Sequence, residues 1–133
     1  MAIQLSVGAR NGRLEAIETE AGASAILMIR TGAPPANCAA ADSGTVLATL
    51  NLPADWMGAA AAGAKAKSGT WQDAAADAAG TAAHFRLYKS DGVTCVLQGT
   101  CGQGSGDLSL DNVNIAVGQV VSVTAFTLTD GNA

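Results

Sequence analysis

The feature that most constrains the fold is an alternating segment, a tight turn and a second apolar run, all within residues 70–98. Phe85 and Leu87 would face one side of a strand. The opposite side would carry His84, Arg86 and Tyr88. Ser90-Asp91-Gly92 has the composition of a turn, and apolar residues return after it. This combination is the strongest local signal for a β-hairpin, so we predict a central hairpin in a small β domain.

Other strands are predicted from apolar or β-branched runs bounded by Gly, Pro and Asn. These runs cover residues 24–30, 45–52 and 120–129. The alanine-rich segment 58–69 is ambiguous, but Lys65 and Lys67 alternate with alanines, which favours a half-exposed strand over a helix. With turns every 8–15 residues, the chain predicts a mainly β fold. The pattern favours an antiparallel sandwich or a barrel-like fold over βαβ units, and of these we expect one antiparallel, jelly-roll-like β-sandwich domain over residues 1–133, with one short N-terminal helix.

The N-terminal region, residues 1–22, is predicted to be an arm followed by that helix. Ile3, Leu5 and Val7 alternate, which indicates a short strand or a docking arm. A helix is expected from Arg10 to Ala21, with Asn11 as its cap and Gly22 as its stop.

The helix would carry an acidic face. Glu15, Glu18 and Glu20 lie off the apolar stripe formed by Leu14, Ile17 and Ala21. We expect these carboxylates to be solvated, and the alternative is pairing with a basic partner surface.

Charge and hydropathy exclude several kinds of partner. The net charge is −4, and no basic stripe that could neutralise phosphates is present, which argues against nucleic acid and anionic membranes. No apolar run reaches the roughly 18 residues of a membrane span. The N-terminus lacks a secretory signal pattern, so we expect synthesis in a cytoplasm.

The three cysteines, Cys38, Cys95 and Cys101, cannot all pair within one chain. In one extended strand Cys95 and Cys101 would lie roughly 20 Å apart, too far for a disulfide unless the chain turns back at Gln98-Gly99. Their spacing matches no zinc pattern. Two main interpretations stay open, beside a metal or catalytic use: three reduced, mostly buried thiols, or cross-links between subunits after exposure to an oxidising environment.

No catalytic constellation is visible. The single histidine, His84, has no nucleophile and carboxylate near it in the sequence. The glycines of residues 99–107 form a flexible connection without the Gly-Lys-Ser/Thr of a phosphate loop, and Asp107 and Asp111 lack calcium-loop spacing. We therefore expect a protein that is not an enzyme and has no cofactor and no metal site.

Several motifs together resemble a family of small tailed-bacteriophage virion proteins. The likeness rests on Gly69-Thr70-Trp71-Gln72-Asp73 and on the hairpin from Gly80 to Gly92. Further agreement lies in Val7-Gly8-Ala9-Arg10-Asn11, Thr31-Gly32-Ala33-Pro34-Pro35, Gly44-Thr45-Val46-Leu47-Ala48 and Val117-Gly118-Gln119 with the final strand. The resemblance covers nearly the whole chain, and its motifs are structural.

The resemblance implies a virion structural protein that is synthesised in the cytoplasm of a bacterial host. It would be a β-sandwich that decorates or cements the outside of the capsid. Its partners would be the major capsid protein and copies of itself, in a dimer or trimer. Contacts are expected from the 31–44 loop, the N-terminal arm and edge strands. We also expect inter-subunit disulfides through Cys38, Cys95 or Cys101. This expectation comes from the sequence itself and not from the resemblance. The alternatives are a neck, collar or tail component, and a module that binds the host surface.

Overall fold

The computed structural model describes residues 3–131, and it is mainly β with one helix, as predicted. The helix α1 spans Val7–Ala21. The strands are β1 (Ile26–Arg30), β2 (Val46–Asn51), β3 (Ala64–Ala66), β4 (Gln72–Asp73), β5 (Gly80–Thr81), β6 (His84–Tyr88), β7 (Cys95–Gly102), β8 (Leu108–Leu110), β9 (Asn114–Ile115) and β10 (Val121–Thr129).

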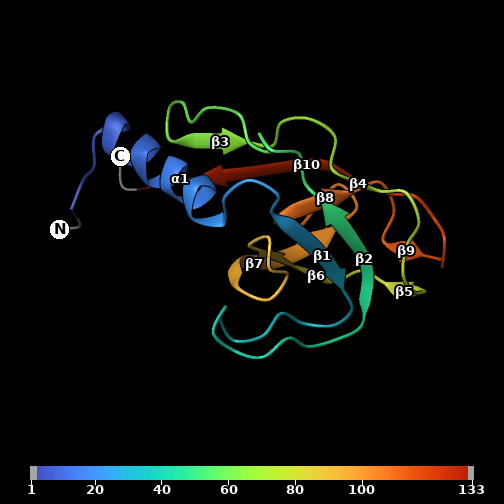
Figure 1. The fold of residues 1–133 in the computed structure, drawn as a ribbon. Coiled ribbons are helices and arrows are strands. Elements are labelled where there is room, and N and C mark those ends of the chain that lie inside the picture. The colour runs from blue at the N-terminus through green and yellow to red at the C-terminus, as the bar shows by residue number, and fades with distance from the viewer. Residues whose placement is uncertain (1–2, 132–133) are drawn as a thin grey trace.

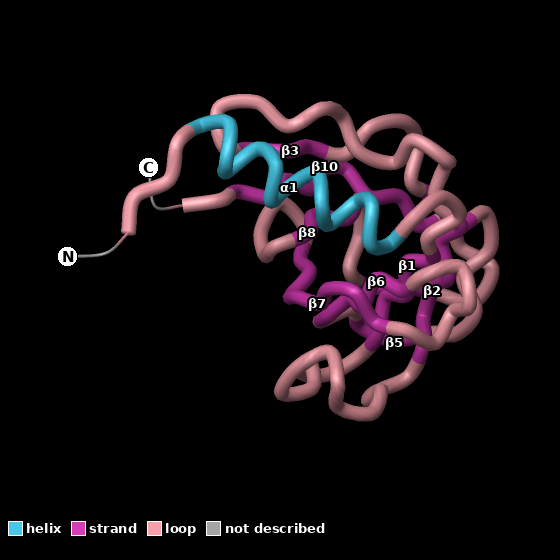
Figure 2. Tube along the Cα trace, turned by 60° about the vertical axis from the view of Figure 1, so that its left-hand side comes forward, coloured by secondary structure: helices cyan, strands magenta, loops and turns pink. Residues whose placement is uncertain are grey.

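Most strands join one curled sheet, in the order β2-β1-β6-β7-β8-β10-β3, and β4 pairs with β10 beside this path. Strands β5 and β9 form a separate small pair. Figures 1 and 2 show the sheet curling so that β10 and β8 lie across from β1 and β2, with α1 along one side next to β3. The pairs are antiparallel except β7 with β8, which run parallel over two residues. The jelly-roll arrangement in particular stays a prediction.

The central hairpin is confirmed. β6 and β7 pair antiparallel through a turn that contains Asp91 and Gly92. Asp91 accepts hydrogen bonds from the amides of Val93 and Thr94, at 2.8 Å each, and Gly92 has a φ of 69°. The glycine therefore occupies the left-handed region that a side chain disfavours. The prediction of a flexible connection from residue 99 was wrong in part, because β7 continues to Gly102.

The core lies inside the curl and is organised by aromatic rings. Trp71 packs against Trp56 and Phe126, with ring centroids 5.8 and 5.5 Å apart, and Phe85 meets Phe126 edge-on at 5.7 Å. The indole N–H of Trp71 donates to the carbonyl oxygens of Trp56 and Ser68, so this buried polar group is satisfied. These large rings compensate for the many alanines elsewhere in the chain.

The helix starts earlier than predicted. Ser6, not Asn11, is the N-cap, and its hydroxyl accepts from the amide of Ala9 at 3.1 Å. Gly22 ends the helix as predicted. Ile3 is 81% exposed and belongs to no strand, so the predicted N-terminal strand is not formed within residues 3–6. The part of the predicted arm at residues 1–2 lies outside the described residues.

The acidic face of α1 is not merely solvated, because it pairs with lysines of the same chain. Lys65 of β3 is 1% exposed, and its Nζ lies 3.0 Å from Glu15 and 2.9 Å from Glu18. Glu20 lies 2.9 Å from Lys89. The strand around Lys65 is confirmed, but the prediction that this lysine is half-exposed was wrong. Burial without the carboxylates would be unfavourable, so these ion pairs fix α1 against β3.

Candidate functional site

The outer face of the central hairpin is covered by the loop of residues 31–45. His84, Arg86 and Tyr88 lie on this face and are consequently buried, whereas Phe85 and Leu87 are buried in the core on the other face. A carboxylate from the loop, Asp42, meets two buried arginines. Its carboxylate pairs with Arg86 and lies 3.2 Å from Arg30, and it accepts a hydrogen bond of 2.6 Å from the Tyr88 hydroxyl. We call Arg30, Asp42, Arg86 and Tyr88 the polar cluster.

The same face also holds the loop by its carbonyl oxygens. Arg86 donates to the carbonyls of Asn37, Cys38 and Ala40 at 3.1, 3.0 and 3.2 Å. Gln98 donates to the carbonyl of Pro35 at 2.6 Å. A buried guanidinium with several fixed acceptors gives a loop one defined path. These contacts make the loop an ordered cover of the hairpin's outer face.

The electrostatics of the polar cluster favour a permanent ion pair over proton transfer. Burial raises the pKa of Asp42, but the hydrogen bonds from Tyr88 and Arg86 and the charge of Arg30 outweigh burial and lower it from its usual 3.8. Burial and the hydrogen bond to Asp42 raise the pKa of Tyr88 to about 12. Neither group titrates near neutral pH, so the arrangement is suited to holding the loop.

The one tyrosine of the chain makes this cluster measurable. Titration followed by the ultraviolet absorbance of the phenolate should give a midpoint near 12 in the folded protein and near 10 in denaturant. Because the unfolded chain releases this proton first, the contribution of Tyr88 to stability is present below pH 10 and is lost as pH rises through 12. Circular dichroism at each pH identifies the folded state. A folded protein that is largely ionised at its tyrosine near pH 10 would contradict the geometry.

The three predicted cysteines fall into two places. Cys38 on the loop and Cys95 on β7 lie together, with their sulfur atoms 2.9 Å apart, and both are half-buried free thiols. Cys101 lies six residues along the same strand and packs against the hydrophobic core. Burial raises the pKa of Cys101 to about 11. Burial and the hydrogen bond to Cys38 raise the pKa of Cys95 to about 12.

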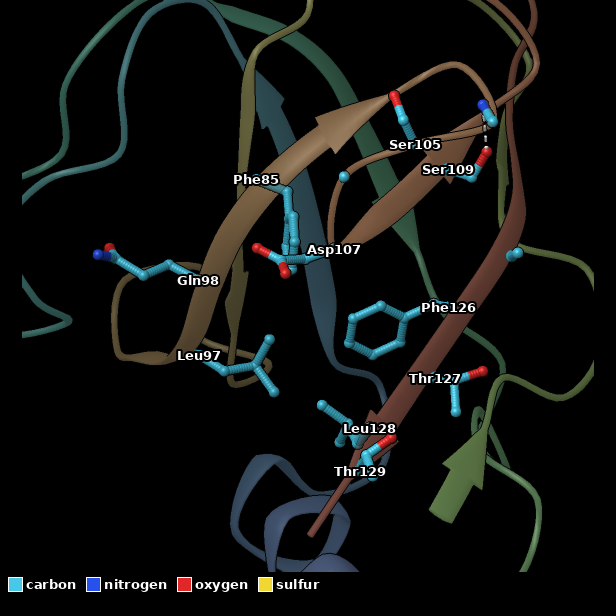
Figure 3. Close-up of a pocket in the computed structure, with 13 residues that line it drawn as sticks. Phe85, Leu97, Gln98, Ser105, Asp107, Ser109, Phe126, Thr127, Leu128 and Thr129 are labelled. Atoms are coloured by element: carbon cyan, nitrogen blue, oxygen red, sulfur yellow. Dashed lines mark hydrogen bonds between the residues drawn. The ribbon is translucent and has the colours of Figure 1, made fainter. Parts of the chain in front are cut away.

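A groove opens on the other side of the hairpin, between β7 and β10, with a volume of about 740 Å³. Figure 3 shows Leu97 and Leu128 approaching each other from its two walls, with Phe126 between the strands and Asp107 beside Phe85. The residues that line it are Phe85, Leu97, Gln98, Gly104, Ser105, Gly106, Asp107, Ser109, Ala125, Phe126, Thr127, Leu128 and Thr129.

Two strand edges face this groove. β7 pairs with β6 over residues 95–100 but meets β8 only at Cys101 and Gly102. β10 pairs with β8 over residues 123–126, whereas residues 127–129 pair only with β3, on the opposite side. The sheet therefore has a gap where no described strand joins β7 to the end of β10.

Asp107 protects one end of the open edge. Its carboxylate accepts from the amide of Thr100 at 2.9 Å and from the Thr100 hydroxyl at 3.1 Å. A Cβ at residue 99 would lie 2.7 Å from this carboxylate and 3.0 Å from the ring of Phe85, which explains the glycine there. Farther along β7, at Gln98 and Leu97, no described strand pairs with this edge. Open edges of this kind accept an added strand.

The single histidine of the chain contacts the loop. His84 is buried, and its Nδ1 lies 2.7 Å from the carbonyl oxygen of Gly32, so this ring acts as a further contact between β6 and the loop.

Within residues 3–131 no group of three or more His, Cys, Asp or Glu side chains is placed to hold a metal ion. None of the described helices is long and apolar enough to cross a membrane.

Sequence reasoning missed Asp42, Asp107 and the groove. A signal for Asp42 existed: Arg30 and Arg86 lie in apolar strands, and a buried arginine needs a carboxylate partner. The groove had no local signal, because it forms between segments about 30 residues apart in the chain.

Comparison of the chain with protein-family models, curated protein sequences and solved structures gives no match.

Proposed function

We propose that this chain is a structural protein of a bacteriophage virion, a decoration or cement protein that binds the outside of the capsid. It would bridge neighbouring subunits of the major capsid protein and stabilise the head. The class of protein is supported by the motif resemblance described above. The observation that carries the binding role is the groove between β7 and β10, where two strand edges face each other over an apolar floor.

The occupant that fits this groove is an extended segment of the major capsid protein. A strand between Gln98 and Thr127 would find backbone donors and acceptors on both sides. Apolar side chains at every second position would contact Leu97, Phe126 and Leu128. Asp107 at one end favours a basic residue in the partner. Many such contacts over a capsid surface add by multivalency, so each one can be weak.

Addition of purified protein to particles assembled without it tests this proposal. We expect saturable binding, and Leu97→Glu should weaken it by at least about tenfold, because a charge would lie on the apolar wall of the groove. Val93→Glu is the matched control, since Val93 is 76% exposed on the same hairpin and outside the groove. Thr127→Glu, at an exposed position of the opposite wall, provides a second variant that should fold normally.

The outcomes separate the alternatives. Equal binding of Leu97→Glu and Val93→Glu would exclude the groove as the contact surface. Saturation at a few copies per particle would favour a neck, collar or tail position. Binding to host cells but not to particles would favour a host-surface module.

A further inference from the structure

The thiols of Cys38 and Cys95 are brought together by two independent features of the fold. The sulfur atoms lie 2.9 Å apart, although the residues are 57 positions apart in the chain. A disulfide requires only that the two sulfurs close to about 2.05 Å with compatible backbone positions.

The first feature is a β-bulge. Leu87 pairs with Leu97, but its neighbour Tyr88 pairs with Cys95, so Val96 is an extra residue in β7. Such a bulge reverses which face of the strand the residues before it occupy. Cys95 therefore shares the face of Tyr88, which the loop covers, whereas Cys101 packs against the core.

The second feature is the fixed path of the loop. Arg86 donates to the carbonyl oxygen of Cys38 itself at 3.0 Å and to that of Asn37 at 3.1 Å. Gln98, three residues beyond Cys95, donates to the carbonyl of Pro35. The buried Arg86 of β6 and the half-buried Gln98 of β7 thus place Cys38 against Cys95 before any bond forms.

We propose that Cys38 and Cys95 form a disulfide within one chain on exposure to a small-molecule disulfide such as oxidised glutathione, and that Cys101 stays a thiol. In the first step the Cys38 thiolate attacks one glutathione sulfur, and a glutathione thiolate leaves and takes up the proton. The Cys95 sulfur then attacks the Cys38 sulfur, and the second glutathione leaves with the Cys95 proton. The Cys38–Cys95 bond forms, the glutathione disulfide breaks, and the two electrons and two protons pass to glutathione.

This bond would change the expectation drawn from the sequence. Two of the three cysteines expected to form inter-subunit disulfides would be bonded to each other within the chain. Only Cys101 would remain for a bond to another subunit. The bond would tie the 31–45 loop covalently to the hairpin, and it would restrict the unfolded chain over a long loop, which stabilises the folded state. Formation of this bond does not depend on the proposed function, because it takes place in the isolated protein.

The test is a thiol count after oxidation. Reduced protein is incubated with oxidised glutathione, unfolded in denaturant that contains an alkylating reagent, and analysed by peptide mapping. We expect one alkylated cysteine per chain instead of three, and a peptide that links Cys38 to Cys95. Cys101→Ser should form the same link with no thiol remaining, whereas Cys38→Ser should form no protein disulfide.

A second readout is the urea midpoint of unfolding, which should rise on oxidation and return on reduction in the wild type and in Cys101→Ser. Cys38→Ser should show no such shift. Disulfide-linked dimers as the main product, or three thiols still present after oxidation, would overturn the proposal. A midpoint that falls on oxidation would contradict the expected stabilisation, because the bond would then distort the fold.

Discussion

Replacing Asp42 with alanine is expected to lower the free energy of unfolding by about 2–3 kcal/mol, and the melting temperature by roughly 6–15 °C. Arg86 and Arg30 are 2% and 8% exposed at their side chains, so the change leaves two buried cations without their carboxylate. Loss of a buried partner costs more than this, but Asp42 is 42% exposed, and water screens part of the interaction. Arg86 also keeps its carbonyl acceptors on the loop.

Asp55→Ala is the matched control for this change. Asp55 is exposed and takes part in none of the ion pairs described above, so its replacement should alter the free energy of unfolding by less than about 0.5 kcal/mol. Urea unfolding followed by circular dichroism measures both variants. If the two variants were equally stable, the polar cluster would not hold the loop.

Acidification should reproduce part of the Asp42→Ala effect. The pKa of Asp42 is lowered in the folded protein, so its contribution to stability is present above the ordinary value of 3.8 and is lost as pH falls through the folded value. The stability of Asp42→Ala should therefore depend less on pH in this acidic range than that of the wild type.

Replacing Trp71 with alanine is expected to lower the free energy of unfolding by about 3–5 kcal/mol. Trp71 is 1% exposed and contacts the rings of both Trp56 and Phe126, so its removal leaves a cavity at the centre of the aromatic cluster. A domain of this size has a total stability of about 5–15 kcal/mol, so the variant is expected to be marginal. Phe126 also forms part of the groove, and binding to particles should weaken together with stability.

Trp71→Phe separates packing from hydrogen bonding. The ring is largely kept, but the carbonyl oxygens of Trp56 and Ser68 lose their indole donor. A loss of about 1–2 kcal/mol is expected, well below that of Trp71→Ala. The urea midpoints of the two variants measure the difference. A Trp71→Ala variant that is as stable as Trp71→Phe would show that the aromatic cluster does not organise the core.

The parts of the fold that were predicted correctly depend on local chemistry. The hairpin was predictable because alternation in 84–88 and the Asp91-Gly92 turn act over a few residues. The same holds for the end of the helix at Gly22. The start of the helix was not predictable, because Ser6 and Asn11 are both good N-caps and the sequence does not decide between them.

The candidate site depends on contacts between distant segments. Alternation predicts which face of β6 carries Arg86 and Tyr88, but not that the loop of residues 31–45 covers this face. The sequence pattern predicts a half-exposed Lys65, because its burial depends on two carboxylates that α1 supplies from a distant part of the chain. The bulge at Val96 changes the face of Cys95, and no residue type marks it in advance.

The most direct test of the central claim is the number of copies of this chain in purified virions, measured by quantitative mass spectrometry against the major capsid protein. A decoration protein that bridges capsid subunits should be present in a fixed ratio to that protein, in numbers comparable with the capsid's repeating units. Absence of the chain from mature particles, or a handful of copies per particle, would contradict the account.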